Sequence, residues 1–228
     1  MKKFNLRKYQ IIILLPLLLV YSLWINMKNN KTIRYVALGD SYTICEGATW
    51  EQSWPHILTN NLKKQGINIE LIANPSKTGW TTQNLIDNEL PVFDNSQPTF
   101  STLLIGVNDW VQEVSKESFH KNLSIIIDHV QKKTGNKLIL ITIPDFSVTP
   151  EGPKYSKGRN ISEGLQEFNH IIKEEAKQRK LPCVDIFPTS LNMLYNADLI
   201  SSDNLHPSAK EYAIWEQLIY STAYELLK

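Results

Sequence analysis

Short apolar runs recur along the chain from residue 33 onwards, and polar residues or glycines follow each of them. The runs are rich in Ile, Val and Leu. Short runs of this composition are typical of strands that are buried on both faces. The sequence therefore predicts five buried strands, at Ile33–Leu38, Ile67–Ala73, Phe100–Ile105, Lys137–Ile143 and Cys183–Phe187.

Between these runs, apolar residues repeat at the three- and four-residue spacing of amphipathic helices, which predicts core packing rather than cofactor binding. Four such stripes are present: Trp54, Leu58 and Leu62; Phe119, Leu123, Ile126, Ile127 and Val130; Ile161, Leu165, Phe168, Ile172 and Ala176; and Tyr212, Trp215, Ile219 and Leu226. Ser53 is suited to cap the first helix, and Pro207 is suited to begin the last. The connector at 81–90 is expected to be short.

The alternation of strands and helices predicts an α/β fold, in which one five-stranded parallel sheet is covered by helices on both faces. The chain has 228 residues, enough for one full-sized domain. Ligands of such sheets bind beyond the carboxyl ends of the strands. The residues directly after each apolar run are therefore the first candidates for a functional site.

The N-terminal segment differs from the rest of the chain. Lys2, Lys3, Arg7 and Lys8 precede Ile11–Ile25, which carries no charge. This is the layout of a signal anchor or signal peptide at residues 1–28, ahead of a domain at 29–228. The favoured interpretation is an uncleaved anchor in the cytoplasmic membrane with the domain outside the cytoplasm, because positive charge stays on the cytoplasmic side. A cleaved signal and a secreted or periplasmic protein is the alternative.

The charges and cysteines exclude several classes of partner. Without the six basic residues of 1–31, 18 basic and 23 acidic residues remain in 32–228, a net charge of −5. Binding to nucleic acid phosphates needs clustered positive charge, so nucleic acid is not expected as a partner. Cys45 and Cys183 fit neither a disulfide framework nor a metal site. Because they lie at opposite ends of parallel strands, both are expected to be free thiols.

Polar residues cluster at the predicted strand ends. Gly39-Asp40-Ser41 follows the first run, Asn74 to Trp80 follows the second, and Gly106-Val107-Asn108-Asp109 follows the third. A loop beyond the fifth run carries Asp203-Asn204-Leu205-His206. Each motif alone is weak, because such residues are also common in turns and caps. Their joint occurrence at one edge of the sheet favours a functional site.

These residue types suit acyl transfer. A serine such as Ser41 is a weak nucleophile and needs a nearby base. His206 could be that base, with Asp203 fixing its tautomer. The oxyanion of a tetrahedral intermediate needs donors, which the Asn108 amide and the backbone N–H groups of Gly79 and Ser41 could supply.

The order of these motifs resembles that of the SGNH (GDSL-type) hydrolase family, from about residue 33 to 227. The resemblance implies a three-layer α/β/α flavodoxin-like fold and ester hydrolysis through an acyl-enzyme. Ser41 would be the nucleophile, His206 the general base and Asp203 its partner, with Ser41, Gly79 and Asn108 as the oxyanion hole. No metal or organic cofactor is implied. Cys45 departs from the pattern, since a glycine is expected there.

Three functions stay open. The favoured one is an exported, membrane-tethered carboxylic ester hydrolase that acts as a monomer on a small-molecule, polysaccharide or lipid ester. A sugar O-acyltransferase would use the same acyl-enzyme. A non-catalytic carbohydrate- or lipid-binding domain is the third. Specificity is expected to depend on the loops at 44–52, 110–116 and 146–160.

Overall fold

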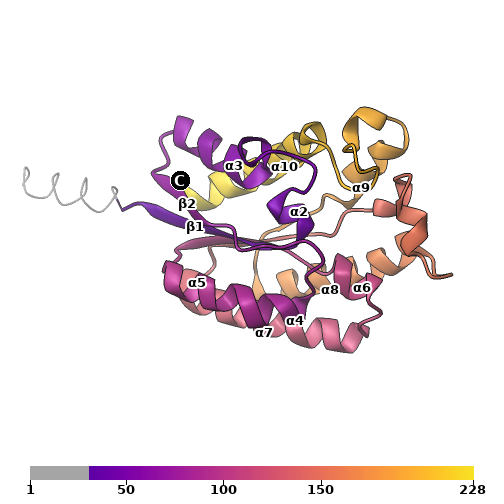
Figure 1. Ribbon diagram of the computed structural model, residues 1–228. Coiled ribbons are helices and arrows are strands. Elements are labelled where there is room, and N and C mark those ends of the chain that lie inside the picture. Colours follow the sequence, from indigo (N-terminus) through magenta and orange to yellow (C-terminus); the bar gives the residue numbers. More distant parts are fainter. Residues whose placement is uncertain (1–30) are drawn as a thin grey trace, which may run out of the picture. The chain divides into compact units, whose positions relative to one another are not determined.

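A five-stranded parallel sheet forms the centre of the computed structural model, which describes residues 31–228 (Figure 1). The strands are β1 (Ile33–Gly39), β2 (Ile69–Ala73), β3 (Phe100–Leu104), β4 (Leu138–Ile141) and β5 (Cys183–Val184). Their order across the sheet is β2-β1-β3-β4-β5. The predicted α/β fold with a five-stranded parallel sheet is therefore confirmed.

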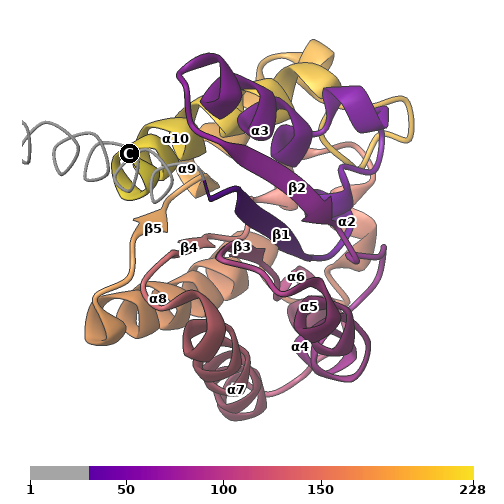
Figure 2. The same cartoon turned by 90° about the vertical axis from the view of Figure 1, so that its left-hand side faces the viewer.

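Helices cover both faces of the sheet (Figures 1 and 2). On one face, α3 (Trp54–Lys64) packs against α10 (Ala209–Leu227). On the other face lie α5 (Leu90–Ser96), α7 (Lys116–Thr134) and α8 (Ile161–Arg179). The shorter helical elements are α2 (Ser41–Ile44), η1 (Trp50–Gln52), α4 (Thr82–Asn84), η2 (Leu85–Glu89), α6 (Val107–Val111), η3 (Phe146–Val148), η4 (Gly152–Tyr155), α9 (Phe187–Ser190), η5 (Leu191–Leu194) and η6 (Ala197–Leu199).

The apolar stripes form the core between the helices and the sheet, as their spacing predicts. Every predicted stripe residue is buried except Leu226, which is half-buried, and Leu227 is buried next to it. Ile33–Lys228 forms one compact unit. The predicted anchor at 1–28 lies outside the described residues. Within 31–228, no helix combines the length and the apolar character needed to cross a membrane.

Several predicted boundaries were wrong, and tertiary contacts explain two of them. The last helix begins at Ala209 rather than Pro207, because the C=O group of Leu199 accepts from Ser208 N at 2.7 Å and pairs this segment with the preceding loop. β5 ends at Val184, because the next residues turn away and the N–H groups of Ile186 and Phe187 donate to Thr142 Oγ1.

The third boundary concerns the connector at 81–90. It belongs to a helical run from Thr82 to Ser96 that passes through the π-helical turn Leu85–Glu89. Pro91 lies two residues beyond the end of this turn. Proline has no N–H to continue the α-helical pattern, so the wider turn accommodates it.

Candidate active site

The turn after β1 presents Ser41 at the carboxyl edge of the sheet. The strand ends at Gly39. Glycine fits this position because a Cβ atom there would come within 2.3 Å of the Leu104 carbonyl oxygen on β3. Asp40 then caps the short helix α2, and its Oδ1 accepts from Tyr42 N at 3.0 Å. Ser41 is the first residue of that helix, where backbone N–H groups have no acceptor within the helix. The turn thus brings the Ser41 hydroxyl close to the Ser41 backbone N–H, which has no acceptor within the helix.

Cys45 ends α2 in a left-handed conformation, with a φ of 64°. This conformation favours glycine, which is the residue expected here from the family resemblance. The backbone therefore keeps the shape of a glycine turn although it carries a side chain. The Cys45 thiol is buried, and burial raises its pKa. Both cysteines are free, as predicted.

The loop before α10 forms a tight turn around the Asp203 carboxylate. Oδ2 lies 2.7 Å from His206 Nδ1. Oδ1 accepts from Ser201 Oγ at 2.6 Å, Leu205 N at 2.8 Å and His206 N at 2.9 Å. Asn204, with a φ of 62°, lets the chain reverse between Asp203 and His206. Partial burial raises the pKa of Asp203, but these hydrogen bonds outweigh it and hold the pKa well below its usual range.

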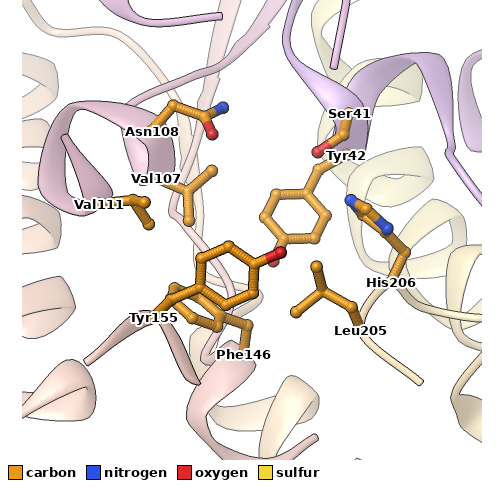
Figure 3. Close-up of a pocket in the computed structure, with 9 residues that line it drawn as sticks. All are labelled: Ser41, Tyr42, Val107, Asn108, Val111, Phe146, Tyr155, Leu205 and His206. Carbon is orange, nitrogen blue, oxygen red and sulfur yellow. The ribbon is translucent and has the colours of Figure 1, made fainter. Parts of the chain in front are cut away.

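Ser41, Asn108 and His206 line one pocket, although they come from three distant parts of the chain (Figure 3). Figure 3 shows the His206 ring turned towards the Ser41 hydroxyl, with the Asn108 side chain on the opposite side of the serine. Because Nδ1 of His206 is engaged by Asp203, the other ring nitrogen, Nε2, is available to the pocket. The contact between His206 Nε2 and the Ser41 hydroxyl is expected to tighten when substrate binds, because catalytic hydrogen bonds are often long in unliganded sites.

Asn108 in α6 and Gly79 in the loop after β2 belong to adjacent segments at the same edge of the sheet as the serine. Asn108 Nδ2 donates to the Trp80 carbonyl at 3.0 Å and lies 3.5 Å from Asp40 Oδ2. Gly79 has a φ of 83°, a conformation that a residue with a side chain rarely adopts. Its carbonyl accepts from Gln112 Nε2 at 3.0 Å. The structure therefore brings all five predicted site residues to the same edge of the sheet.

Three buried carboxyl groups, those of Asp40, Glu89 and Asp109, lie in and beneath the turn that carries Ser41. Burial, together with a smaller contribution from the neighbouring charge of Asp109, raises the pKa of Asp40 to about 8. Glu89 Oε2 accepts from Gly39 N at 3.1 Å, while Oε1 has no hydrogen-bond partner among residues 31–228. Burial raises the pKa of Glu89 well above its usual range. Asp109 accepts from Thr82 N at 2.9 Å and so fixes the start of α4.

The apolar part of the pocket was not assigned residue by residue from the sequence. It is lined by Val107, Val111, Phe146, Tyr155 and Leu205. Three of these lie in the loops at 110–116 and 146–160 that were expected to govern specificity, but apolar loop residues carry no motif. Trp110, which also follows β3, is buried beneath Arg159 and packs in the core instead of reaching the pocket.

Other titratable residues lie outside this pocket. His120 pairs with Glu175 at 2.6 Å, and His129 pairs with Asp94 at 2.9 Å, so these histidines link helices. Among residues 31–228, no cluster of three or more His, Cys, Asp or Glu side chains could hold a metal ion. The site therefore combines a serine hydroxyl, an imidazole paired with a carboxylate, and amide donors. These are the groups that acyl transfer requires.

Comparison with protein families agrees with this chemistry. Residues 37–214 match the GDSL-like Lipase/Acylhydrolase family. The chain is 24% identical over 195 residues to an arylesterase from Vibrio mimicus, covering 85% of this chain and 88% of that protein. The family match spans most of the chain and includes Ser41, Gly79, Asn108, Asp203 and His206.

Solved structures share the fold at lower identity. A lipase/acylhydrolase from Enterococcus faecalis aligns with a TM-score of 0.69 and 21% identity, covering 86% of this chain and 97% of that one. A psychrotrophic esterase from Pseudoalteromonas sp., in a structure inhibited by monoethylphosphonate, gives 0.66 and 20%, with coverages of 85% and 98%. The acetyl xylan esterase AlAXEase gives 0.67 and 19%, with coverages of 83% and 99%.

Proposed function

The chain belongs to the GDSL-like lipase/acylhydrolase family and is a carboxylic ester hydrolase, and we propose that Ser41, His206 and Asp203 carry its reaction through an acyl-enzyme. The observation that carries the proposal is the meeting of three chain segments in one pocket. Ser41 follows β1, Asn108 follows β3, and His206 lies in the turn whose carboxylate holds its Nδ1.

In the first half-reaction, Ser41 Oγ attacks the ester carbonyl carbon while His206 Nε2 takes the hydroxyl proton. The carbonyl oxygen becomes an oxyanion, and Asn108 Nδ2 with the N–H groups of Ser41 and Gly79 stabilises its charge. The carbon–oxygen bond to the alcohol then breaks, and His206 returns its proton to the departing alkoxide. In the second half-reaction, water attacks the acyl-enzyme by the same route and releases the acid.

Asp203 has two tasks in this mechanism. Its 2.7 Å contact to Nδ1 keeps the proton on that nitrogen, so that Nε2 accepts from Ser41. Its negative charge stabilises the imidazolium that forms when the proton arrives. The hydrogen bonds from Ser201, Leu205 and the His206 backbone keep the carboxylate ionised and fix its orientation.

The nucleophile is tested by labelling residues 29–228 with a fluorophosphonate probe. We expect one labelled residue, Ser41, and no labelling of Ser41→Ala. Ser202→Ala is the matched control, because this exposed serine lies in the loop beside His206 and should leave labelling unchanged. Labelling of Ser41→Ala at the wild-type rate would refute the assignment. Product analysis with and without an added acceptor sugar separates hydrolysis from transfer to a sugar hydroxyl.

We also propose that the protein is exported and tethered to the membrane through residues 1–28, outside the described structure. The uncharged run behind a basic cluster supports this. Recovery of a soluble protein cleaved near residue 22 from the medium or periplasm would overturn the tether.

A further inference from the structure

The apolar side chains beside Ser41 line a small space that is open to solvent on one side. The pocket has a volume of about 60 Å³. A water-sized group needs roughly 10–15 Å³ of such space, so about four to six fit. The lower number corresponds to the carbons of a short acyl chain such as butyryl. The pocket is therefore matched to a short acyl group attached to the serine, and its far wall decides how much longer the chain can be.

Tyr155 and Phe146 form that wall (Figure 3). The two rings meet edge to face, with centroids 6.1 Å apart and planes at 88°. Phe146 is buried and rests in turn on Trp110, with centroids 6.3 Å apart. Tyr155 is 39% exposed, so its ring separates the pocket from solvent. A chain longer than the pocket would have to pass the place that this ring occupies.

The segment that carries Tyr155 is held firmly in place. Glu151 N donates to the Asn204 carbonyl at 3.1 Å, which fastens it to the turn that holds His206. At Gly152, a Cβ atom would lie 2.0 Å from the Phe146 carbonyl oxygen, so the segment folds tightly back on itself. Thr149 Oγ1 donates to the same oxygen at 2.9 Å. The ring of Tyr155 is thus a fixed wall of the pocket.

Tyr42 closes the pocket from the serine side. Its ring is buried and lines the pocket, pointing towards Tyr155 in Figure 3. The Tyr42 ring also lies edge to face with Trp215 at 5.8 Å, which limits its freedom to move aside. Tyr155 has solvent on its outer side, so it is the one of the two rings whose removal opens the pocket.

We propose that Tyr155 is the specificity-determining residue that limits the acyl group to short chains, from acetyl to about butyryl. This inference rests on the proposed function, because it assumes that the acyl group is carried by Ser41. Each methylene group that is buried in the pocket raises the binding affinity about fourfold. A methylene group that meets the Tyr155 ring is not buried and clashes with the ring.

The test measures kcat/KM for 4-nitrophenyl acetate, butyrate, hexanoate and octanoate. Wild type should fall at least tenfold between butyrate and octanoate. Tyr155→Ala should raise the octanoate-to-acetate ratio by at least about tenfold and leave acetate within about threefold. Tyr155→Phe keeps the ring and should keep the wild-type profile. Tyr155→Trp should lower butyrate relative to acetate.

Tyr195→Ala is the matched control, because Tyr195 is 84% exposed and lies outside the pocket. An unchanged chain-length profile in Tyr155→Ala, with acetate hydrolysis intact, would overturn the inference and leave the proposed function standing. A wild-type preference for octanoate would overturn it equally. Absence of both ester hydrolysis and fluorophosphonate labelling in wild type would overturn the proposed function, and this inference with it.

Discussion

Two turns meet in the pocket, and the carboxyl groups that support them have pKa values shifted in opposite directions. The Asp203 turn lies at the surface, and four donor contacts keep its carboxylate charged. The Ser41 turn is buried, and Glu89 beneath it accepts one N–H, while its other oxygen has no partner in the described part of the chain. Accordingly the pKa is lowered at Asp203 and, through burial, raised at Glu89.

The difference separates the two functions of an acidic residue. A carboxylate that must stabilise a positive imidazolium needs its charge, and hydrogen bonds supply the stabilisation that burial removes. A carboxyl that only supports a backbone turn can stay neutral, because an uncharged oxygen still accepts an N–H. The comparison therefore predicts large catalytic effects at the Asp203 turn and effects on stability, but little on catalysis, at Glu89.

The largest effect is expected for Asp203→Asn. The amide oxygen can still accept from Ser201 and the backbone, so the turn should persist, but the charge and the His206 tautomer are lost. We expect kcat for 4-nitrophenyl acetate to fall about 10⁴-fold with little change in thermal unfolding. Asp198→Asn is the control, since exposed Asp198 pairs only with Lys210 through its carboxylate and should keep full activity. Loss of less than tenfold at Asp203 would contradict its role.

Asn108→Ala should have the next largest effect. Its amide should act on the developing oxyanion, so kcat should fall about 10²–10³-fold while KM changes little. In a Ser41→Ala background, the same substitution should lower the residual rate far less, because groups that act as a unit are not additive. If KM rose while kcat held, Asn108 would bind the ground state, and the oxyanion role would have to be withdrawn.

Glu89→Gln should change the pH dependence of stability. The folded-state pKa lies above the unfolded value of about 4.3, so the protonated group stabilises the fold at low pH. This contribution is complete below pH ~4 and is lost as the pH rises. While only the unfolded state is ionised, the slope is up to about 1.4 kcal/mol per pH unit.

Urea unfolding of wild type and Glu89→Gln between pH 5 and 8 measures this difference. The variant should gain stability relative to wild type as the pH rises and should keep wild-type kcat. Asp203 contributes with the opposite sign, because its lowered pKa makes stability fall only as the medium becomes strongly acidic. Parallel pH curves for wild type and variant would mean that Glu89 is ionised in the folded state.

The smallest effect is expected for Gln112→Ala. Gln112 Nε2 donates to the Gly79 carbonyl and so helps to orient the loop whose N–H we propose as an oxyanion donor. One exposed hydrogen bond contributes about 1 kcal/mol, or roughly fivefold in kcat. KM should stay constant. Gln83→Ala is matched, because Gln83 makes a similar exposed contact to Asp87 away from the pocket. Equal kinetics in both variants would remove Gln112 from the site.

The sequence by itself determined the sheet and the main helices, and it predicted the five candidate site residues. Buried strands and amphipathic helices have different periods, so Ile33–Gly39 and Lys116–Thr134 can be recognised from local pattern. Chemistry-bearing residues such as Ser41 and His206 are also recognisable, because a parallel sheet brings the carboxyl ends of its strands to one edge.

Only the tertiary structure decided the pocket wall and the state of the buried acids. Tyr155 becomes a wall because Gly152 folds back on Phe146 and Glu151 bonds to Asn204, contacts between loops that have no sequence period. Glu89 falls in the connector at 81–90, to which the sequence assigns no role, yet it lies beneath the Gly39 turn, and its protonation depends on that burial. Local pattern reports the period of a segment, whereas loop packing and desolvation depend on which distant residues come together.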